Sequence, residues 1–374
     1  MATKKATKKK ADKKNKGEWG ERYCCPKIIH TRQIRFGDKD LNIPDNNNFI
    51  TVSKLTTADQ QQSFSLEPNT SLVAVTKGAG KPESKNLAKI INENTLNNII
   101  SEIKKGKTDK ATFELPEFKS MEKKLGINFK GGTSSQKADI FLDIEYDGTK
   151  KKDVGFSIKS GFGAPPSLLN ATAQTNFVYE IPGCSKESLS EVNEITTGQY
   201  RIINRIKKIR ELGLGFKYAN MTSEIFCKNL TEIDKALPEL ISKMLPQFYI
   251  NRYDRLSCNL FKLSDFGKDT IKGKTEIKEF LMAIMFGMVP SKEWTRKHQA
   301  EGLIVVKGNG DLVCFYEKNF TAGKDYLFEK AYFDTPSRKN ANMGKKAGGQ
   351  EMAELYEKKG KVYINLGLQI RLKF

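Results

Sequence analysis

The chain has 374 residues, of which 38% are hydrophobic and 29% charged, a composition typical of a globular protein with one large domain or two smaller ones. Its 64 lysines and arginines against 44 acidic residues give a formal net charge of +20, which favours a polyanionic partner over a merely soluble basic protein. No apolar segment follows the N-terminal lysines as in a secretory signal, and the longest apolar run, Phe280–Val289, is too short to cross a bilayer.

The first sixteen residues are rich in lysine, and such a run repels itself, so we expect a disordered tail over residues 1–16. Hydrophobic spacing then predicts helices and strands along the chain. Helices are expected over Gly17–Ile29 (interrupted by Pro26), Asn86–Lys104, Gln199–Leu212, Leu230–Met244 and Lys278–Met288. Strands are expected over Phe49–Leu55, Ser71–Thr76, Leu303–Val306, Leu312–Tyr316 and Lys361–Phe374.

Helices before and after a central β unit predict an α/β fold, with α+β as the alternative. A weakly marked boundary near 190–200 separates a core over 17–200 from a helical region over 201–374, which can also belong to the same domain. The six cysteines include no C-x-x-C pair, so we expect reduced, buried thiols in a cytoplasmic protein and no zinc knuckle.

The most informative segment is the hairpin predicted over residues 137–160. Asp139 opens its first strand and Lys159 closes its second, so pairing of the arms brings the two close together. In a phosphodiesterase, a carboxylate holds Mg²⁺, which neutralises the scissile phosphate and lowers the pKa of a bound water. A nearby lysine orients the attacking water. The plain alternative is a solvated, charged hairpin.

Five blocks of sequence resemble the HpaII-type family of type II restriction endonucleases. The central block is GFSIKSGFGAPPSLLNATAQTNF over residues 155–177, which follows the family's pattern closely. The others, in chain order, are NKGEWGE (15–21), EGLIVVKGNGDLVCFY (301–316), DYLFEKAYFDTPS (325–337) and YINLGLQIRLKF (363–374). They run from residue 15 to the end, so the resemblance covers nearly the whole chain.

The resemblance implies a PD-(D/E)xK nuclease core within residues 17–200, a mixed central sheet flanked by helices, that cuts duplex DNA with Mg²⁺. The helical region over 201–374 would then recognise the DNA. Asp139 would bind the metal and Lys159 would be the catalytic lysine. Ser157 stands where many relatives of the wider superfamily have an acidic residue, so a second carboxylate must come from elsewhere. Glu18 and Glu21 share one face of the first helix and both remain candidates, with the Ile158 carbonyl as a further ligand.

Several residues are candidates for contacts with DNA, by base readout or by phosphate binding. They are Arg338, Lys339 and Asn340 after Thr-Pro-Ser, Gln369 and Arg371 near the C-terminus, Asn170 in the central block, and Arg201 and Arg205 on a basic helix face. Such a basic face is more often simply a solvated helix surface. The family pattern continues after Thr-Pro-Ser to Ser-Arg-His, and this chain has no histidine there, so its target can differ.

The function implied is a type II restriction endonuclease that makes Mg²⁺-dependent double-strand cuts in a short palindromic target, with CCGG suggested by the family. Its partners would be double-stranded DNA, a second copy of the chain on that DNA, and a DNA methyltransferase that protects the host. The alternative is a catalytically decayed, DNA-binding protein of the same fold. An RNA-associated basic protein would account for the lysine tail but not for the ordered blocks.

Overall fold

The structure is a computed structural model that describes residues 12–45, 47–66, 70–106, 111–129, 137–196, 201–254, 271–336 and 351–374. The chain divides into two compact units. The first comprises Met1–Pro166 and Gln299–Phe320, and the second comprises Ser167–His298 and Thr321–Phe374. The chain therefore leaves the first unit, returns to it late in the sequence, and ends in the second.

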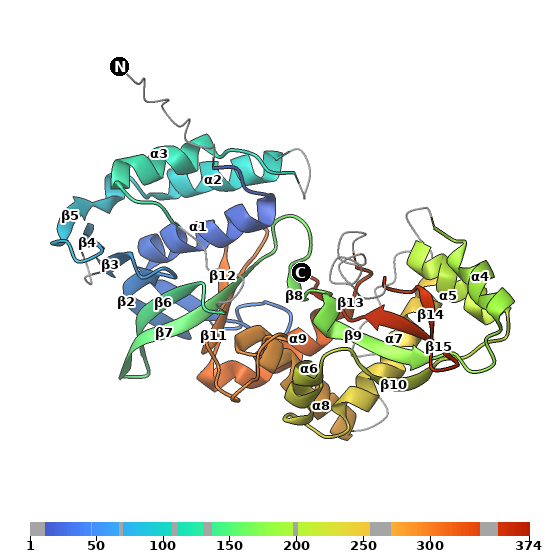
Figure 1. Cartoon of the computed structure of the whole chain (residues 1–374). Helices are drawn as coiled ribbons and strands as arrows, with labels where there is room; N and C mark the ends of the chain where they lie inside the picture. The colour runs from blue at the N-terminus through green and yellow to red at the C-terminus, as the bar shows by residue number, and fades with distance from the viewer. Residues whose placement is uncertain are drawn as a thin grey trace, which may run out of the picture. The chain divides into compact units, whose positions relative to one another are not determined.

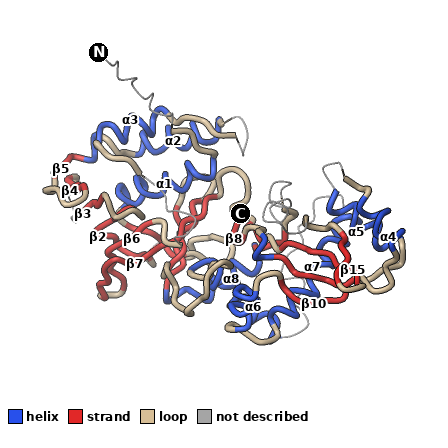
Figure 2. The backbone as a smooth tube through the Cα atoms, viewed as in Figure 1, coloured by secondary structure: helices blue, strands red, loops and turns tan. Residues whose placement is uncertain are grey.

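The first unit combines a large sheet with helices that cover it (Figures 1 and 2). Its strands are β1 (Gln33–Phe36), β2 (Phe49–Thr57), β3 (Gln62–Leu66), β4 (Leu72–Lys77), β5 (Glu83–Asn86), β6 (Ile140–Tyr146), β7 (Thr149–Ser160), β11 (Gly302–Val306) and β12 (Leu312–Tyr316). Its helices are α1 (Lys16–Thr31), α2 (Glu93–Lys105) and α3 (Pro116–Leu125), with 3₁₀ turns η1 (Leu87–Lys89) and η5 (Glu317–Asn319).

The sheet of this unit is mixed. Within the described residues its nine strands are hydrogen-bonded in the order β1-β12-β11-β7-β6-β2-β3-β4-β5. β7 runs antiparallel to β6 and parallel to β11, so it lies inside the sheet. β1 also pairs with β2, and these pairings close β1, β12, β11, β7, β6 and β2 into a ring. The register sets Lys159 of β7 opposite Val305 of β11.

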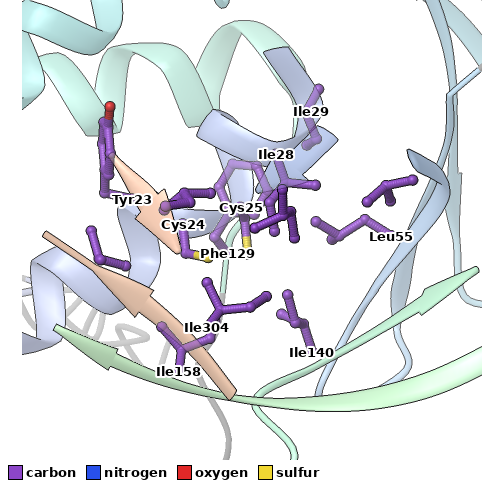
Figure 3. Packing of buried hydrophobic residues seen from close by; sticks show 14 of the residues in the cluster. Tyr23, Cys24, Cys25, Ile28, Ile29, Leu55, Phe129, Ile140, Ile158 and Ile304 are labelled. Carbon is purple, nitrogen blue, oxygen red and sulfur yellow. The ribbon is translucent and has the colours of Figure 1, made fainter. Parts of the chain in front are cut away.

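Helix α1 lies between the sheet and the helices α2 and α3 (Figure 1). Figure 3 shows its Cys24 and Cys25 above Ile140, Ile158 and Ile304 of the strands, and all five side chains are buried. Each buried side chain of this kind contributes on the order of 1.5–3 kcal/mol. Packing on two sides therefore fixes the position of α1 against β6 and β7.

This packing also explains why α1 continues where an interruption was expected. Pro26 lies inside the helix, which runs on to Thr31. An internal proline removes one backbone hydrogen bond and costs about 3 kcal/mol. Burial of several side chains on two faces outweighs that cost, so the expected break at Pro26 is wrong.

A buried carboxyl in α3 gives the unit a pH-dependent stability. Glu122 is 7% exposed, and its Oε1 accepts the Phe129 N–H at 2.7 Å. Burial raises the pKa of Glu122 from 4.5 to about 7, although the bond from Phe129 and the charge of Arg22 lower it. Because the folded-state pKa lies above the unfolded value, the ionised form is disfavoured in the fold. The stability contributed by neutral Glu122 is therefore fully present below about pH 4.5 and is lost as the pH rises through about 7.

We expect Glu122→Gln to stabilise the protein at pH 8 but not at pH 4.5, because glutamine keeps the acceptor for Phe129 and carries no charge. The upper bound of the gain is about 3 kcal/mol, from the difference between the two pKa values. Urea unfolding at both pH values measures it, with the exposed Glu114→Gln as the control. Equal effects of Glu122→Gln at the two pH values would contradict the assignment.

The second unit contains two smaller sheets and further helices (Figure 2). Its strands are β8 (Ser167–Leu169), β9 (Asn176–Glu180), β10 (Lys217–Met221), β13 (Ala331–Phe333), β14 (Leu355–Lys358), β15 (Lys361–Gly367) and β16 (Ile370–Leu372). Its helices are α4 (Lys186–Asn193), α5 (Arg201–Glu211), α6 (Glu224–Thr231), α7 (Leu237–Asp254), α8 (Ile271–Phe286) and α9 (Phe320–Lys330), with the 3₁₀ turn η2 (Ala173–Thr175).

Tyrosine hydroxyls tie helix α7 to the strands of this unit. Among the described residues one sheet has the order β10-β9-β15-β14 and the other the order β13-β16-β8. Tyr249 of α7 donates to the Gly367 carbonyl at 2.9 Å, and Tyr179 of β9 donates to the Ser242 carbonyl of α7 at 2.8 Å. Both bonds are buried, where an unpaired hydroxyl would be costly.

Four predicted elements are divided or differ by more than two residues from the structure. The helix expected over Lys278–Met288 already begins at Ile271. The helix expected over Asn86–Lys104 begins only at Glu93, because Asn92 caps it by accepting the Thr95 N–H at 2.9 Å. The helix expected over Leu230–Met244 is divided between α6 and α7. The closing run forms two strands, β15 and β16, that belong to different sheets.

The observed class is mixed α/β, as predicted, with a mixed central sheet. The compact units do not coincide with the expected ranges 17–200 and 201–374, because β11 and β12 complete the sheet of the first unit. The expected division of roles between those ranges stays a prediction. None of the described helices is long and apolar enough to cross a membrane.

The described cysteines are free thiols, and three of them (Cys24, Cys25 and Cys314) are buried. Burial raises the pKa of the Cys25 thiol to about 12, which keeps it protonated and unreactive. Cys258 lies outside the described residues.

Candidate active site

The hairpin of β6 and β7 holds Asp139 against the neighbouring strand. The backbone N–H of Asp139 donates to the Phe156 carbonyl at 2.8 Å. The carboxylate oxygen Oδ2 of Asp139 accepts hydrogen bonds from the Ile158 N–H at 2.7 Å and from the Ser157 hydroxyl at 3.3 Å. Both side-chain bonds use Oδ2, so the carboxylate is fixed while Oδ1 takes part in neither bond.

Strand β7 contributes three further groups at this end of the hairpin. Successive strand residues face opposite sides, so Ser157 and Lys159 share one face while Ile158 packs in the core. The N–H and C=O of a strand residue point to the same edge. The Ile158 carbonyl therefore faces the edge that Asp139 approaches. Ser157 is only 2% exposed, and Lys159 is half-buried.

Gly20 lets helix α1 lie unusually close to this end of β7. A Cβ atom on Gly20 would overlap the Ser160 hydroxyl and lie 2.7 Å from the Phe162 ring. The next residue, Glu21, belongs to the turn of α1 that lies near this end of β7, although it stands more than a hundred residues earlier in the chain. Helix α1 can come this close to β7 only if the residue at position 20 has no side chain.

The two glutamates of α1 have different surroundings. Glu18 belongs to the capping box of the helix: its Oε2 accepts the Asn15 N–H at 2.9 Å, and its own N–H donates to Asn15 Oδ1 at 2.9 Å. Burial raises the pKa of Glu21 to about 7; the positive charge of Lys159 lowers it, and the negative charges of Asp139 and Glu18 raise it. Glu21 therefore lies within the electrostatic reach of both hairpin residues.

We expect Gly20→Ala to lower the free energy of unfolding by about 1–3 kcal/mol, the usual cost of overpacking. The added methyl group must push α1 away from β7, so any activity that depends on Glu21 falls as well. Chemical denaturation measures the first effect. The matched control is Gly215→Ala, since a Cβ there would meet nothing within 4 Å. Equal losses in the two variants would contradict the close approach.

A second lysine belongs to this cluster and was missed in the sequence. Burial lowers the pKa of Lys137 to about 8; the charge of Lys159 lowers it further, and that of Asp139 raises it. Lys137 stands two positions before Asp139, a spacing that places alternate residues of an extended chain on one side. That spacing is the signal available in the sequence, but lysines before strands are common and usually solvated.

The donor set suits a hard divalent cation. No described group of three or more His, Cys, Asp or Glu residues forms a metal site. Mg²⁺, however, is usually held by only one or two carboxylates, with water and substrate phosphate completing its shell. Asp139 Oδ1, the Glu21 carboxylate and the Ile158 carbonyl would supply such a set. Burial, and to a smaller extent the negative charge of Asp139, disfavour the ionised form of Glu21, and a cation bound between the two carboxylates would offset that cost.

Of the DNA-contact candidates at the C-terminus, Gln369 is held inside the second unit. It is 2% exposed, and its amide donates to Asp334 Oδ2 at 3.2 Å. Arg371 donates to the same oxygen at 2.6 Å. Both side chains therefore brace Asp334, and the burial of Gln369 argues against base readout by that residue.

The arginines of α5 also point inward, contrary to the expected solvated basic face. Arg205 is buried and donates to the Ile195 carbonyl at 3.0 Å, and Arg201 forms an ion pair with the buried Glu351. Asn170 is exposed directly after β8. Arg338, Lys339 and Asn340 lie outside the described residues.

The chain matches the family described as HpaII restriction endonuclease over residues 15–372. It is 29% identical over 373 residues to the type II restriction enzyme HpaII of Haemophilus parainfluenzae, an alignment that covers 96% of this chain and 98% of that protein. No solved structure matches the chain. The resemblance seen in the sequence is thus confirmed across nearly the full length. The chain belongs to the HpaII restriction endonuclease family, a family of site-specific DNA hydrolases.

Proposed function

We propose that this protein is a Mg²⁺-dependent type II restriction endonuclease whose active site is of the PD-(D/E)xK kind and lies at the end of the β6–β7 hairpin. The observation that carries the proposal is the gathering of Glu21, Asp139 and Lys159 at that end, inside a chain of a restriction endonuclease family. Two carboxylates and a lysine match the needs of phosphodiester hydrolysis.

The carboxylates of Asp139 and Glu21 would hold the metal, with the Ile158 carbonyl as a third ligand. Mg²⁺ bound there would neutralise charge at the scissile phosphate and make water more acidic. The Ser157 hydroxyl is not a ligand in this proposal. It donates to Asp139 Oδ2 and, together with the Ile158 N–H, orients the carboxylate. Glu18 stays in the helix cap and takes no part.

Lys159 acts on the reacting phosphate. Lys159 is half-buried, so it is partly open to a substrate, and its positive charge acts on the Glu21 carboxylate. It holds the attacking water in line and stabilises the negative charge that grows on the phosphate oxygens. A cation fixed in a site with little water acts more strongly than one in bulk solvent.

The substrate is double-stranded DNA that carries a short palindrome, and CCGG is the first target to test. A palindrome cut in both strands requires two active sites, so the protein acts as a homodimer on DNA. The partner enzyme is a DNA methyltransferase that protects the same target in the host. The proposed DNA contacts are Asn170 and the segment with Arg338, Lys339 and Asn340. Arg371 contributes indirectly, because its side chain holds Asp334 in place through a hydrogen bond.

Incubation of plasmid DNA with the purified protein tests the proposal, with Mg²⁺ in one arm and EDTA in the other. We expect discrete fragments only with Mg²⁺, and sequencing of their ends gives the target and the position of the cut. Random degradation, or fragments that form equally in EDTA, would refute it.

A DNA-binding protein without catalysis is the second candidate, because a serine stands at position 157, where many relatives of the wider superfamily have an acid. Retarded migration of target DNA without cleavage, at any Mg²⁺ or Mn²⁺ concentration, would favour it.

A further inference from the structure

A loop over residues 289–299 joins helix α8 to strand β11, and the buried Asn229 of α6 holds its first half. The side-chain amide of Asn229 donates to the Lys292 carbonyl at 2.8 Å, and its side-chain oxygen accepts the Trp294 N–H at 2.9 Å. These bonds satisfy an amide that would be costly to bury without partners. The first half of the loop is therefore anchored to the body of the second unit.

The second half of the loop packs against the end of α8. A Cβ on Gly287 would lie 2.6 Å from the Lys297 carbonyl and 3.2 Å from the indole nitrogen of Trp294. Arg296 adopts a φ of 62° and donates through two nitrogens to Glu232 Oε2, at 3.1 and 2.8 Å. A residue other than glycine keeps such a φ only where its surroundings fix it, and this kind of strain is concentrated at functional sites. The loop therefore presents its side chains from a fixed backbone.

Two exposed lysines of this loop have no acidic partner in it. Glu293, the acidic residue of the loop, pairs with Lys228 of α6 at 3.0 Å. Lys292 and Lys297 are exposed, and neither forms an ion pair with the described part of the chain. The Trp294 indole donates to the Lys297 carbonyl at 3.3 Å, which keeps both lysines on one compact loop. Such lysines are often simply solvated, but two on a fixed backbone form a positive surface that suits a polyanion.

The loop leads directly to the hairpin of the proposed active site. A Cβ on Gly155 would lie 3.0 Å from the carbonyl of Gln299, the last residue of the loop, and 3.1 Å from the Ala138 side chain. The loop end and the segment that enters β6 thus both cross over β7 at Gly155, and the Lys137 N–H donates to Gln299 Oε1 at 3.3 Å. Gly155 lies roughly 13 Å along the strand from Lys159. Covalent continuity therefore keeps the end of the loop near the hairpin.

The charge of DNA suits this placement. A duplex carries about one negative charge per 1.7 Å of its axis. DNA whose scissile phosphate lies at Lys159 therefore has several further phosphates over a distance of roughly 13 Å. Lysine binds phosphate as a point charge, so a contact of this kind fixes the position of the duplex without reading its bases.

We propose that the 289–299 loop binds the DNA backbone, with Lys292 and Lys297 on phosphates of the duplex outside the scissile bond. The inference rests on the proposed function and adds a surface that holds the duplex beside the site. Lys159 remains the group that acts on the reacting phosphate. The loop lysines orient the duplex before the reaction starts.

The test compares Lys292→Met/Lys297→Met with wild type and with Lys217→Met/Lys358→Met, a control that removes two exposed lysines from strands β10 and β14 of the same unit. The first readout is the affinity in EDTA, as a function of salt, for a duplex that contains CCGG and for one that lacks it. We expect the loop variant to lower the slope of log affinity against log salt by about 1.8, since each phosphate contact contributes about 0.9. The loss should be equal on both duplexes.

The second readout is the single-turnover cleavage rate with Mg²⁺ at saturating DNA. It should stay within about threefold of wild type, because contacts away from the reacting phosphate contribute to binding and not to the chemical step. The control should keep the wild-type slope, and Lys292→Arg/Lys297→Arg should keep it too, since arginine retains the charge.

An unchanged slope in the loop variant, an equal change in the control, or a loss confined to the CCGG duplex would overturn the inference. Both lysines are exposed, so the melting temperature should not change, and a fall large enough to account for the lost affinity would also overturn it. If the wild type does not cut DNA at all, the proposed function fails, and the salt slope still decides whether the loop binds DNA.

Discussion

Lys159→Ala is expected to abolish cleavage, with a fall of about 10³-fold in the single-turnover rate, while leaving most of the affinity for target DNA. The expected fall in rate follows from the loss of a fixed charge that stabilises the transition state, because removing one such group lowers the rate constant by a factor on the order of 10²–10³. Binding is affected less, because many phosphate contacts share it. Quenched-flow cleavage of a short duplex and fluorescence anisotropy measure the two quantities.

The matched control for this variant is Lys152→Ala, which removes the same charge from an exposed position of the same strand. It should cut at close to the wild-type rate. Full activity in Lys159→Ala would refute the catalytic assignment, and a joint collapse of binding and folding would assign Lys159 a structural role instead.

Glu21→Gln is expected to reduce cleavage at least about a hundredfold, whereas Glu18→Gln should retain activity near that of wild type. The removed carboxylate of Glu21 is a proposed metal ligand, and the charge stabilisation that a bound metal provides is worth several kcal/mol. Glutamine at position 18 still offers an oxygen to the Asn15 N–H, so the capping box and helix α1 survive. The two variants differ by one turn of the same helix.

Single-turnover rates across a range of Mg²⁺ concentrations test this pair. For Glu21→Gln we expect a higher Mg²⁺ requirement as well as a lower maximal rate. The opposite ranking, with Glu18→Gln inactive and Glu21→Gln active, would identify Glu18 as the ligand and show that the capping box opens when DNA binds.

Much of the hairpin could be predicted from the sequence, because its signals are local. Alternation of apolar and polar residues defined two strands around a polar turn, and the structure forms β6 and β7 there. The pairing of the arms then brings Asp139 and Lys159 to the same end. This placement of the two residues depends only on the pairing register of β6 with β7 and on the one turn that joins them.

The choice between Glu18 and Glu21 could not be made from the sequence, because both lie on one helix face. It depends on how close α1 comes to β7, which Gly20 and Ser160 decide, and on the use of Glu18 in the helix cap. Lys137 was missed for a related reason. Its place follows from the crossing over Gly155 and the bond to Gln299, a residue 162 positions later.

The basic face of α5 shows how charge patterns mislead when a partner is distant in sequence. Its arginines looked solvated beside the isoleucines of the helix. In the structure Arg205 donates to the Ile195 carbonyl, and Arg201 forms an ion pair with Glu351. Nothing in the sequence alone indicates that Glu351 lies next to this helix. Gln369, near the C-terminus, is similarly drawn inward by Asp334.

The most direct test of the account is to locate the metal itself. Crystals of the Lys159→Ala variant with a target duplex and Mn²⁺ in place of Mg²⁺ would reveal the ion by its anomalous scattering. The account predicts an ion bound by the carboxylates of Asp139 and Glu21 and facing a DNA phosphate. An ion bound by neither carboxylate, with DNA seated elsewhere on the protein, would contradict it.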